Sequence, residues 1–126
     1  MMKSFTSFVL ATMALLSVVS ADIWSLNLYC YRDAQIVLWH SNELGSQTII
    51  WNRDNLKGGN ELCSSDQVIC VKDAAVNMKS CEEVTFDFKV QYANIWSNNV
   101  TAVLHGNLSD VGYTSKTYNF NPSFQP

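Results

Sequence analysis

Basic side chains are scarce in this sequence. Its 126 residues contain eight lysines and arginines against eleven aspartates and glutamates, and the formal net charge is −3 at pH 7. No arginine follows Arg53. A surface of this sign repels phosphate backbones. Nucleic acid is therefore not expected as a partner.

Motifs for catalysis and cofactor binding are absent as well. The chain has no G-x-S-x-G nucleophile elbow, and Gly58-Gly59 is an isolated pair rather than a phosphate-binding loop. It has no C-x-x-C pair, and its two histidines, His40 and His105, stand far apart in sequence. Two such histidines are more often ordinary strand or turn residues than an acid–base pair with Glu43. We expect a non-enzymatic protein with no cofactor and no metal.

The four cysteines are instead expected to form disulfides. An even number of cysteines in a short exported chain is typical of a disulfide framework. Three pairings are compatible with the sequence. Residues 64–67 read as a turn, so we favour a local bridge from Cys63 to Cys70 and a long bridge from Cys30 to Cys81.

A long apolar run occurs only at the start of the chain. Lys3 precedes the mostly apolar residues 5–19, which lead to Val19-Ser20-Ala21. A basic start, a short apolar core and small residues at the end are the features of a secretory signal peptide. A membrane-spanning helix needs about 20 apolar residues, and serines and threonines dilute this shorter run. We therefore predict a signal peptide at residues 1–21, no membrane span, and a single secreted, extracellular domain at residues 22–126.

Apolar residues at a helical spacing are missing from that domain, whereas period-two alternation recurs. In residues 84–92, five apolar side chains share one face and four polar ones share the other. The pattern predicts an all-β fold, a small antiparallel β-sandwich of about seven strands stapled by two disulfides, with a small Greek-key barrel as the alternative. The expected strands are residues 24–31, 35–40, 47–51, 67–72, 84–92, 100–105 and 113–120.

The segments between these strands have the composition of turns. Residues 42–46 and the pair Gly106-Asn107 are rich in residues that favour turns. Residues 73–80 are expected to contain a short helical turn. Two N-glycosylation sequons, at Asn99 and Asn107, lie at or beside predicted turns, and the sequence thus predicts a glycoprotein.

Four tryptophans are many for a domain of this length. Three of them, Trp24, Trp39 and Trp51, lie in or beside predicted strands, where packing in the core is their ordinary role. Trp96 lies in the polar run of residues 94–99 and is the candidate for an exposed ring that stacks on a sugar or anchors a partner. Its expected neighbours at this binding site are Tyr29, Tyr31 and Tyr113.

Two short segments resemble the guanyl-specific microbial ribonucleases. They are Thr85-Phe86-Asp87-Phe88-Lys89-Val90 and Val103-Leu104-His105-Gly106-Asn107. The resemblance implies a carboxylate base, a histidine acid and an arginine. Only His105 carries over as an acid, because Asn94-Ile95-Trp96-Ser97 contains no glutamate and no later arginine exists.

Taken together, these features predict a secreted, non-catalytic recognition or interaction protein that binds a glycan, a cell-wall component or an extracellular protein. The alternatives are a small ribonuclease-like hydrolase or toxin and a carrier of apolar ligands. The carrier would need an interior cavity lined by Phe86, Phe88, Val90 and Leu104. The sequence does not set the oligomeric state.

Overall fold

A computed structural model describes residues 22–52 and 61–124, and the predicted signal peptide lies outside these residues. Within them the chain forms strands joined by turns and short loops, with no helix. The strands are β1 (Ile23–Cys30), β2 (Ala34–Asn42), β3 (Gly45–Trp51), β4 (Leu62–Cys63), β5 (Ile69–Ser80), β6 (Glu83–Tyr92), β7 (Ile95–Trp96), β8 (Val100–Ser109), β9 (Gly112–Ser115) and β10 (Tyr118–Phe120).

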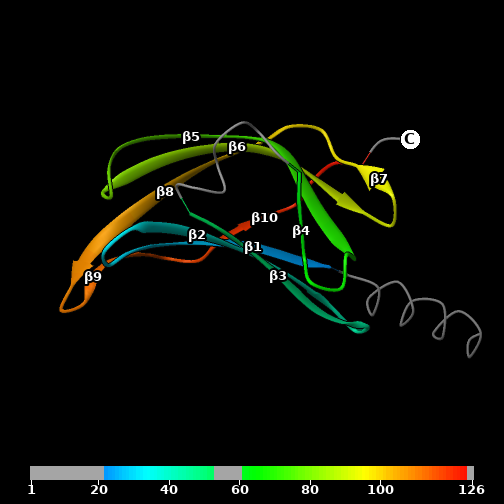
Figure 1. Ribbon diagram of the computed structural model, residues 1–126, viewed down its shortest axis with the longest axis horizontal. Coiled ribbons are helices and arrows are strands. Elements are labelled where there is room, and N and C mark those ends of the chain that lie inside the picture. Colours follow the sequence, from blue (N-terminus) through cyan, green and yellow to red (C-terminus); the bar gives the residue numbers. More distant parts are fainter. Residues whose placement is uncertain (1–21, 53–60, 125–126) are drawn as a thin grey trace, which may run out of the picture.

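All the strand pairs are antiparallel, and they form one continuous path. The order is β3-β2-β1-β9-β8-β6-β5-β4, while β10 also pairs with β1 and β7 also pairs with β6. In Figure 1, β1, β2 and β3 lie in one layer and β5, β6 and β8 in a second, with β9 at the end where the two layers join. The sheet thus folds over on itself and nearly closes into a barrel. The predicted all-β fold is confirmed, and its two facing layers belong to one sheet.

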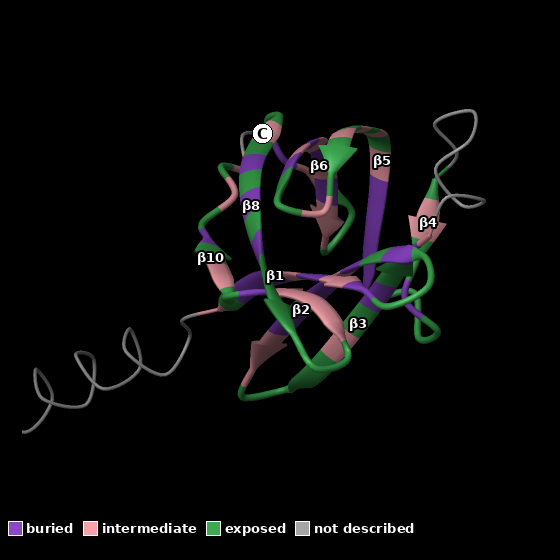
Figure 2. Cartoon of the chain, turned by 90° about the vertical axis from the view of Figure 1, so that its left-hand side faces the viewer, coloured by how far each residue is buried: buried purple, intermediate pink, exposed green. Residues whose placement is uncertain are grey.

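The inward faces of the two layers form the core. Leu26 and Leu28 of β1 and Phe86 and Phe88 of β6 are completely buried, as the period-two pattern of these strands requires. The Phe86 and Phe88 rings stack with centroids 4.7 Å apart, and the Trp51 ring lies 4.9 Å from Phe86. Figure 2 shows the buried segments facing one another between the layers.

Both disulfides have the favoured pairing. Cys30–Cys81 joins the end of β1 to the turn between β5 and β6, and it therefore ties one layer to the other. Cys63–Cys70 joins residues that lie directly opposite each other on β4 and β5. Two disulfides indicate an oxidising compartment, because reducing compartments keep thiols free.

The helical turn expected at residues 73–80 is wrong, because β5 continues to Ser80. The half-buried side chains of Ala74, Val76 and Met78 alternate with exposed neighbours, which is the spacing of a strand on the edge of a core. A shift in register after Lys72, where Asp73 has a positive φ of 54°, separates the two halves of the strand.

The turn expected at Gly106-Asn107 is also wrong. These residues lie inside β8, and the chain turns later, between Ser109 and Gly112. Gly106 is buried, and a Cβ atom there would clash with the carbonyl oxygen of Cys81. Glycine is needed at this position for a close backbone approach rather than for a turn. The strand predicted at residues 113–120 is divided into β9 and β10.

Candidate functional site

The outward face of β1 and β2 carries the candidate site. Because Leu26 and Leu28 point into the core, the alternating residues of β1 point outward. The register then fixes their neighbours on β2, since residues directly opposite each other share a face. The outward pairs are Ser25 with Trp39, Asn27 with Val37, and Tyr29 with Gln35.

Trp39 is the exposed aromatic residue at the centre of this face. Its relative exposure is 52%, although it lies between β1 and β3 in the middle of a layer. The ring borders a hollow of about 300 Å³. The lining residues are Ile23, Ser25, Asn27, Trp39, Ser41, Thr117 and Asn119, and none of them carries a charge. The hollow therefore offers a flat ring, hydroxyl groups and amides, which suits a neutral polar ligand.

A second aromatic group lies farther along β1. The Tyr29 and Tyr31 rings are 6.1 Å apart, and Tyr31 is 53% exposed. The hydroxyl of Tyr31 lies 3.5 Å from Oγ1 of Thr114, the residue opposite Tyr29 on β9. These tyrosines line another hollow, of about 330 Å³, together with Arg32, Asp33 and Gln35.

The structure separates Trp96 from the tyrosines that were expected beside it. Trp96 belongs to β7, which Figure 1 places at the opposite end of the molecule from β9, where β1 ends. Its ring is half-buried, and Nζ of Lys72 lies 4.3 Å from the ring centroid. The expected grouping of Trp96 with Tyr29 and Tyr31 is therefore wrong. The tyrosines share an outward face with Trp39 instead.

Tyr113 does not belong to the outward face either. It lies opposite Cys30, whose side chain points inward, and it is half-buried against the hydrophobic core. The sequence assigned Trp39 to the core, and this assignment is wrong. The signal for its exposure was already present, because Ile36, Leu38 and His40 alternate inward along β2 and leave Trp39 on the other face.

The two histidines lie in different environments and do not form a pair. His40 is completely buried on β2, between the rings of Trp24 at 4.2 Å and Tyr92 at 4.8 Å. Its Nδ1 lies 2.6 Å from Oε1 of Gln47. Its Nε2 lies 3.4 Å from Oδ1 of Asp22 without the alignment of a hydrogen bond. His40 is thus held inside the fold, away from any substrate in solution.

His105 is exposed on β8, directly opposite Glu83 on β6. Both line an open, polar hollow of about 560 Å³ that also includes Lys79 and Thr85. Glu43, the other carboxylate considered for a histidine pair, is exposed in the turn between β2 and β3. The ribonuclease-like alternative would have Glu83 and His105 available here, but none of the residues that line this hollow is an arginine.

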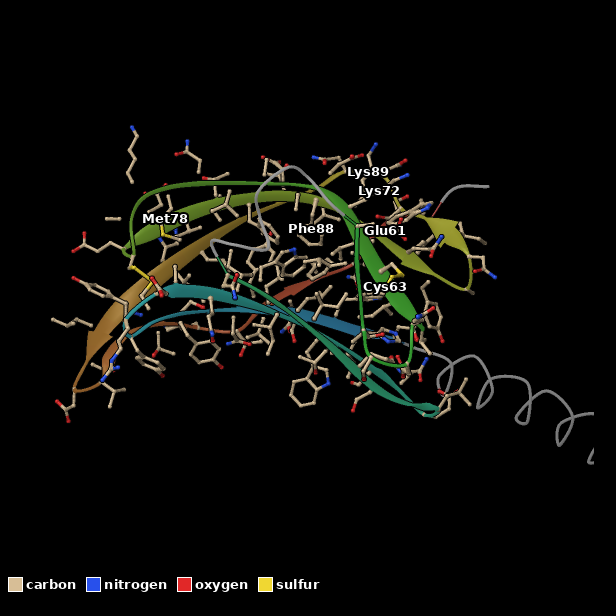
Figure 3. All side chains as sticks on the ribbon, in the orientation of Figure 1. Glu61, Cys63, Lys72, Met78, Phe88 and Lys89 are labelled. Carbon is tan, nitrogen blue, oxygen red and sulfur yellow. A yellow bond between two sulfur atoms is a disulfide. The ribbon has the colours of Figure 1, made fainter. Side chains whose placement is uncertain are left out.

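The four residues expected to line a carrier's cavity are tightly buried. Phe86, Phe88, Val90 and Leu104 are at most 1% exposed. Figure 3 places the Phe88 side chain between the two layers. A separate hollow of about 320 Å³ lies between β2, β3 and β5, and its lining residues are Ala34, Ile36, Trp51, Ala74, Ala75, Val76 and Met78. A ligand in the cavity expected at these four residues would therefore have to displace packed side chains, whereas the separate hollow includes none of them.

One cluster has ligand types that bind metals. Glu61, Cys63 and Cys70 place a carboxylate and two sulfur atoms within 4.8 Å of one another, and Figure 3 shows Glu61 and Cys63 along the segment of β4. The two sulfur atoms are bonded to each other, so neither is a thiolate. Only one carboxylate remains, which does not make a metal centre.

Both sequon asparagines are exposed. Asn99 precedes β8, and its Nδ2 lies 3.4 Å from Oδ1 of Asp87. Asn107 lies near the end of β8, opposite Thr114 of β9. Asn99 lies directly before the start of β8 and Asn107 lies near its end, so both are close to the ends of this strand. The chain does not turn at Asn107 itself, because this residue is still paired within β8. Whether they carry sugars stays a prediction.

Comparison of the chain with protein-family models, curated proteins and solved structures gave no match. In the part of the chain that the structure describes, no helix has the length and apolar character needed to cross a membrane.

Proposed function

We propose that this protein is a secreted, non-catalytic recognition protein that binds a neutral glycan on the outward face of β1 and β2. The observation that supports this most is the half-exposed Trp39 ring beside a hollow whose lining residues carry no charge. One face of a sugar ring presents C–H groups that pack on a flat aromatic ring. The hydroxyl groups around its edge would then meet the side chains of Asn27, Ser41 and Asn119.

The position of Trp39 favours binding for a further reason. A paired strand on each side holds its backbone, because Trp39 lies opposite Ser25 of β1 and Thr48 of β3. A rigid aromatic side chain with only two rotatable bonds loses little conformational entropy when it is covered. The site is therefore preorganised, which reduces the free energy that ordering would cost on binding.

Export is part of this proposal. The predicted signal peptide at residues 1–21 would deliver residues 22–126 to the oxidising compartment that the two disulfides indicate. Glycan polymers and glycosylated surfaces are abundant outside the cell. The sequons at Asn99 and Asn107 would be modified along the same route.

The test is a glycan array with the mature protein and two tryptophan variants. We expect Trp39→Ala to weaken binding by about thirtyfold, the effect of losing a binding hot spot of about 2 kcal/mol. Trp96→Ala is the matched control and should bind like the unmodified protein, because Trp96 lies on β7, which pairs with β6 in the other layer. Unchanged binding by Trp39→Ala, or an array with no bound glycan, would refute the proposed function.

A further inference from the structure

We infer that the site is elongated and that its ligand is a linear chain of β-linked neutral sugars, hexoses or N-acetylhexosamines. This inference rests on the proposed function and extends it. The chain would lie along β1 with one unit on Trp39 and another on the Tyr29–Tyr31 pair. Two aromatic groups on one outward face, separated by polar side chains, are the observation behind it.

The register shows that both aromatic groups are on the same face. Trp39 lies opposite Ser25, and Ser25, Asn27 and Tyr29 alternate along one side of β1. Tyr31 follows two residues later, with its ring beside that of Tyr29. A ligand can therefore contact both aromatic groups without passing around an edge of the sheet.

The separation between the two groups excludes a single sugar as the ligand of both. Ser25 and Tyr29 are four positions apart on β1, which corresponds to about 13 Å at the rise of an extended strand. One pyranose ring is much shorter than this distance. Both groups are occupied together only if several sugars are joined, and each contact then raises the effective concentration of the sugar at the other.

Polar groups lie between the two aromatic contacts. Nδ2 of Asn27 donates a hydrogen bond to Oγ1 of Thr117 at 3.2 Å. This leaves the second amide hydrogen and the carbonyl oxygen of Asn27 free to bond to a ligand. Val37 lies opposite Asn27, is half-buried and carries no polar group. A sugar placed here would meet an apolar floor on β2 and hydrogen-bonding groups on β1.

The shape and charge of the face select the class of glycan. β-1,4-Linked chains, whose equatorial bonds leave opposite sides of each ring, are extended and ribbon-like, so they match a straight strand better than a coiled chain does. The lining of the Trp39 hollow is uncharged, and the tyrosine hollow contains Arg32 and Asp33, whose charges are opposite. Neither end has an excess of positive charge for an acidic polysaccharide, and neutral sugars are therefore favoured.

The test measures affinity against chain length by calorimetry. The probes are chito-oligosaccharides and β-1,4-gluco-oligosaccharides, each from the monosaccharide to the hexasaccharide. We expect affinity in one series to rise by about tenfold or more once the chain reaches both aromatic groups. Tyr31→Ala should remove this gain for long chains, whereas Trp39→Ala should weaken binding at every length.

Two further outcomes separate the inference from the proposed function. If short and long chains bind equally and Tyr31→Ala has no effect, the elongated site is wrong and recognition by Trp39 stands. If neither series binds at any length, the inference is wrong, and the array decides the proposed function separately. Tyr31→Phe is the matched control, because it keeps the ring and should retain the gain with chain length.

Discussion

Asp66 is held in its charged form by the turn between β4 and β5. Its Oδ1 accepts hydrogen bonds from the Ser64 hydroxyl at 2.6 Å and from the Val68 backbone N–H at 3.2 Å. The Ser64 bond is the largest cause that lowers the pKa of Asp66 below its ordinary value of 3.8, and the Val68 bond is the second. The folded state therefore favours the carboxylate.

Removal of the Ser64 hydroxyl should raise the pKa of Asp66. The pKa of Asp66 is lower in the folded state than in the unfolded state, so the charged carboxylate adds to the free energy of unfolding above the ordinary pKa. This contribution is lost as the pH falls through the lower, folded-state pKa. An NMR titration of the Asp66 carboxyl carbon should show a higher pKa in Ser64→Ala than in the unmodified protein. Ser65→Ala, in the same turn, is the control and should leave the pKa where it was. An ordinary Asp66 pKa in the unmodified protein would contradict this account.

The tryptophans show what sequence reasoning can reach for single residues. Three tryptophans were placed in the core, and Trp24 and Trp51 are indeed buried. Trp39 differs because successive side chains on a strand point to opposite faces. Its neighbours Leu38 and His40 face inward, so Trp39 faces outward. The polar surroundings of Trp96 in sequence suggested exposure, but the strand pairing of β7 with β6 and the nearby Lys72 leave it half-buried.

At the scale of elements, the two disulfides should differ in their contribution to stability. Cys30–Cys81 joins the two layers across a sequence separation of 51 residues, and Cys63–Cys70 spans only 7. In the chain-entropy model the loss of the long bridge costs about 4 kcal/mol and the loss of the short one about 2.5 kcal/mol. Urea denaturation of the two double Cys→Ala variants should therefore give a lower free energy of unfolding for the variant without Cys30–Cys81 than for the variant without Cys63–Cys70. A larger loss from the short bridge would contradict the model.

Elements with strong alternation were predictable, and elements that depend on a partner were not. Residues 84–92 were expected as a strand and correspond to β6 within one residue. The second half of β5 was missed because its alanines have little β propensity. Pairing with β6, such as Val76 opposite Phe86, overrides that local preference. The split between β9 and β10 has a similar origin, since both pair with β1 but at different places.

At the scale of the whole molecule, strand order was beyond reach of the sequence. Alternation shows which residues share a face of one strand, but it does not show which strands are neighbours. Here β1 lies between β2, which follows it directly, and β9 and β10 from the end of the chain. The choice between sandwich and barrel, and the grouping of the site residues, both depend on this order. The sequence placed Tyr29 and Tyr31 together, as the structure does, but it did not show that they share a face with Trp39.

Processing of the whole chain provides the last prediction. Expressed in a secretory host, the protein should begin at Asp22 and carry sugars at Asn99 and Asn107, because both asparagines are exposed. Mass spectrometry of the intact protein and its N-terminal peptide measures both features. Asn99→Gln and Asn107→Gln should each remove one glycan mass, and a chain that keeps Met1 and carries no sugar would contradict secretion by this route.

The position of Asn107 gives this measurement a bearing on recognition. Asn107 lies opposite Thr114 on β9, and Thr114 lies opposite Tyr29 on β1, so the three residues form one row across the sheet. A sugar on Asn107 would extend from a position two strands away from the tyrosine contact. A sugar attached to Asn107 could only obstruct the tyrosine end of the site. We therefore expect Asn107→Gln to bind the glycan ligand with the same affinity as the unmodified protein or a higher one. Weaker binding by Asn107→Gln would instead mean that the attached sugar takes part in recognition.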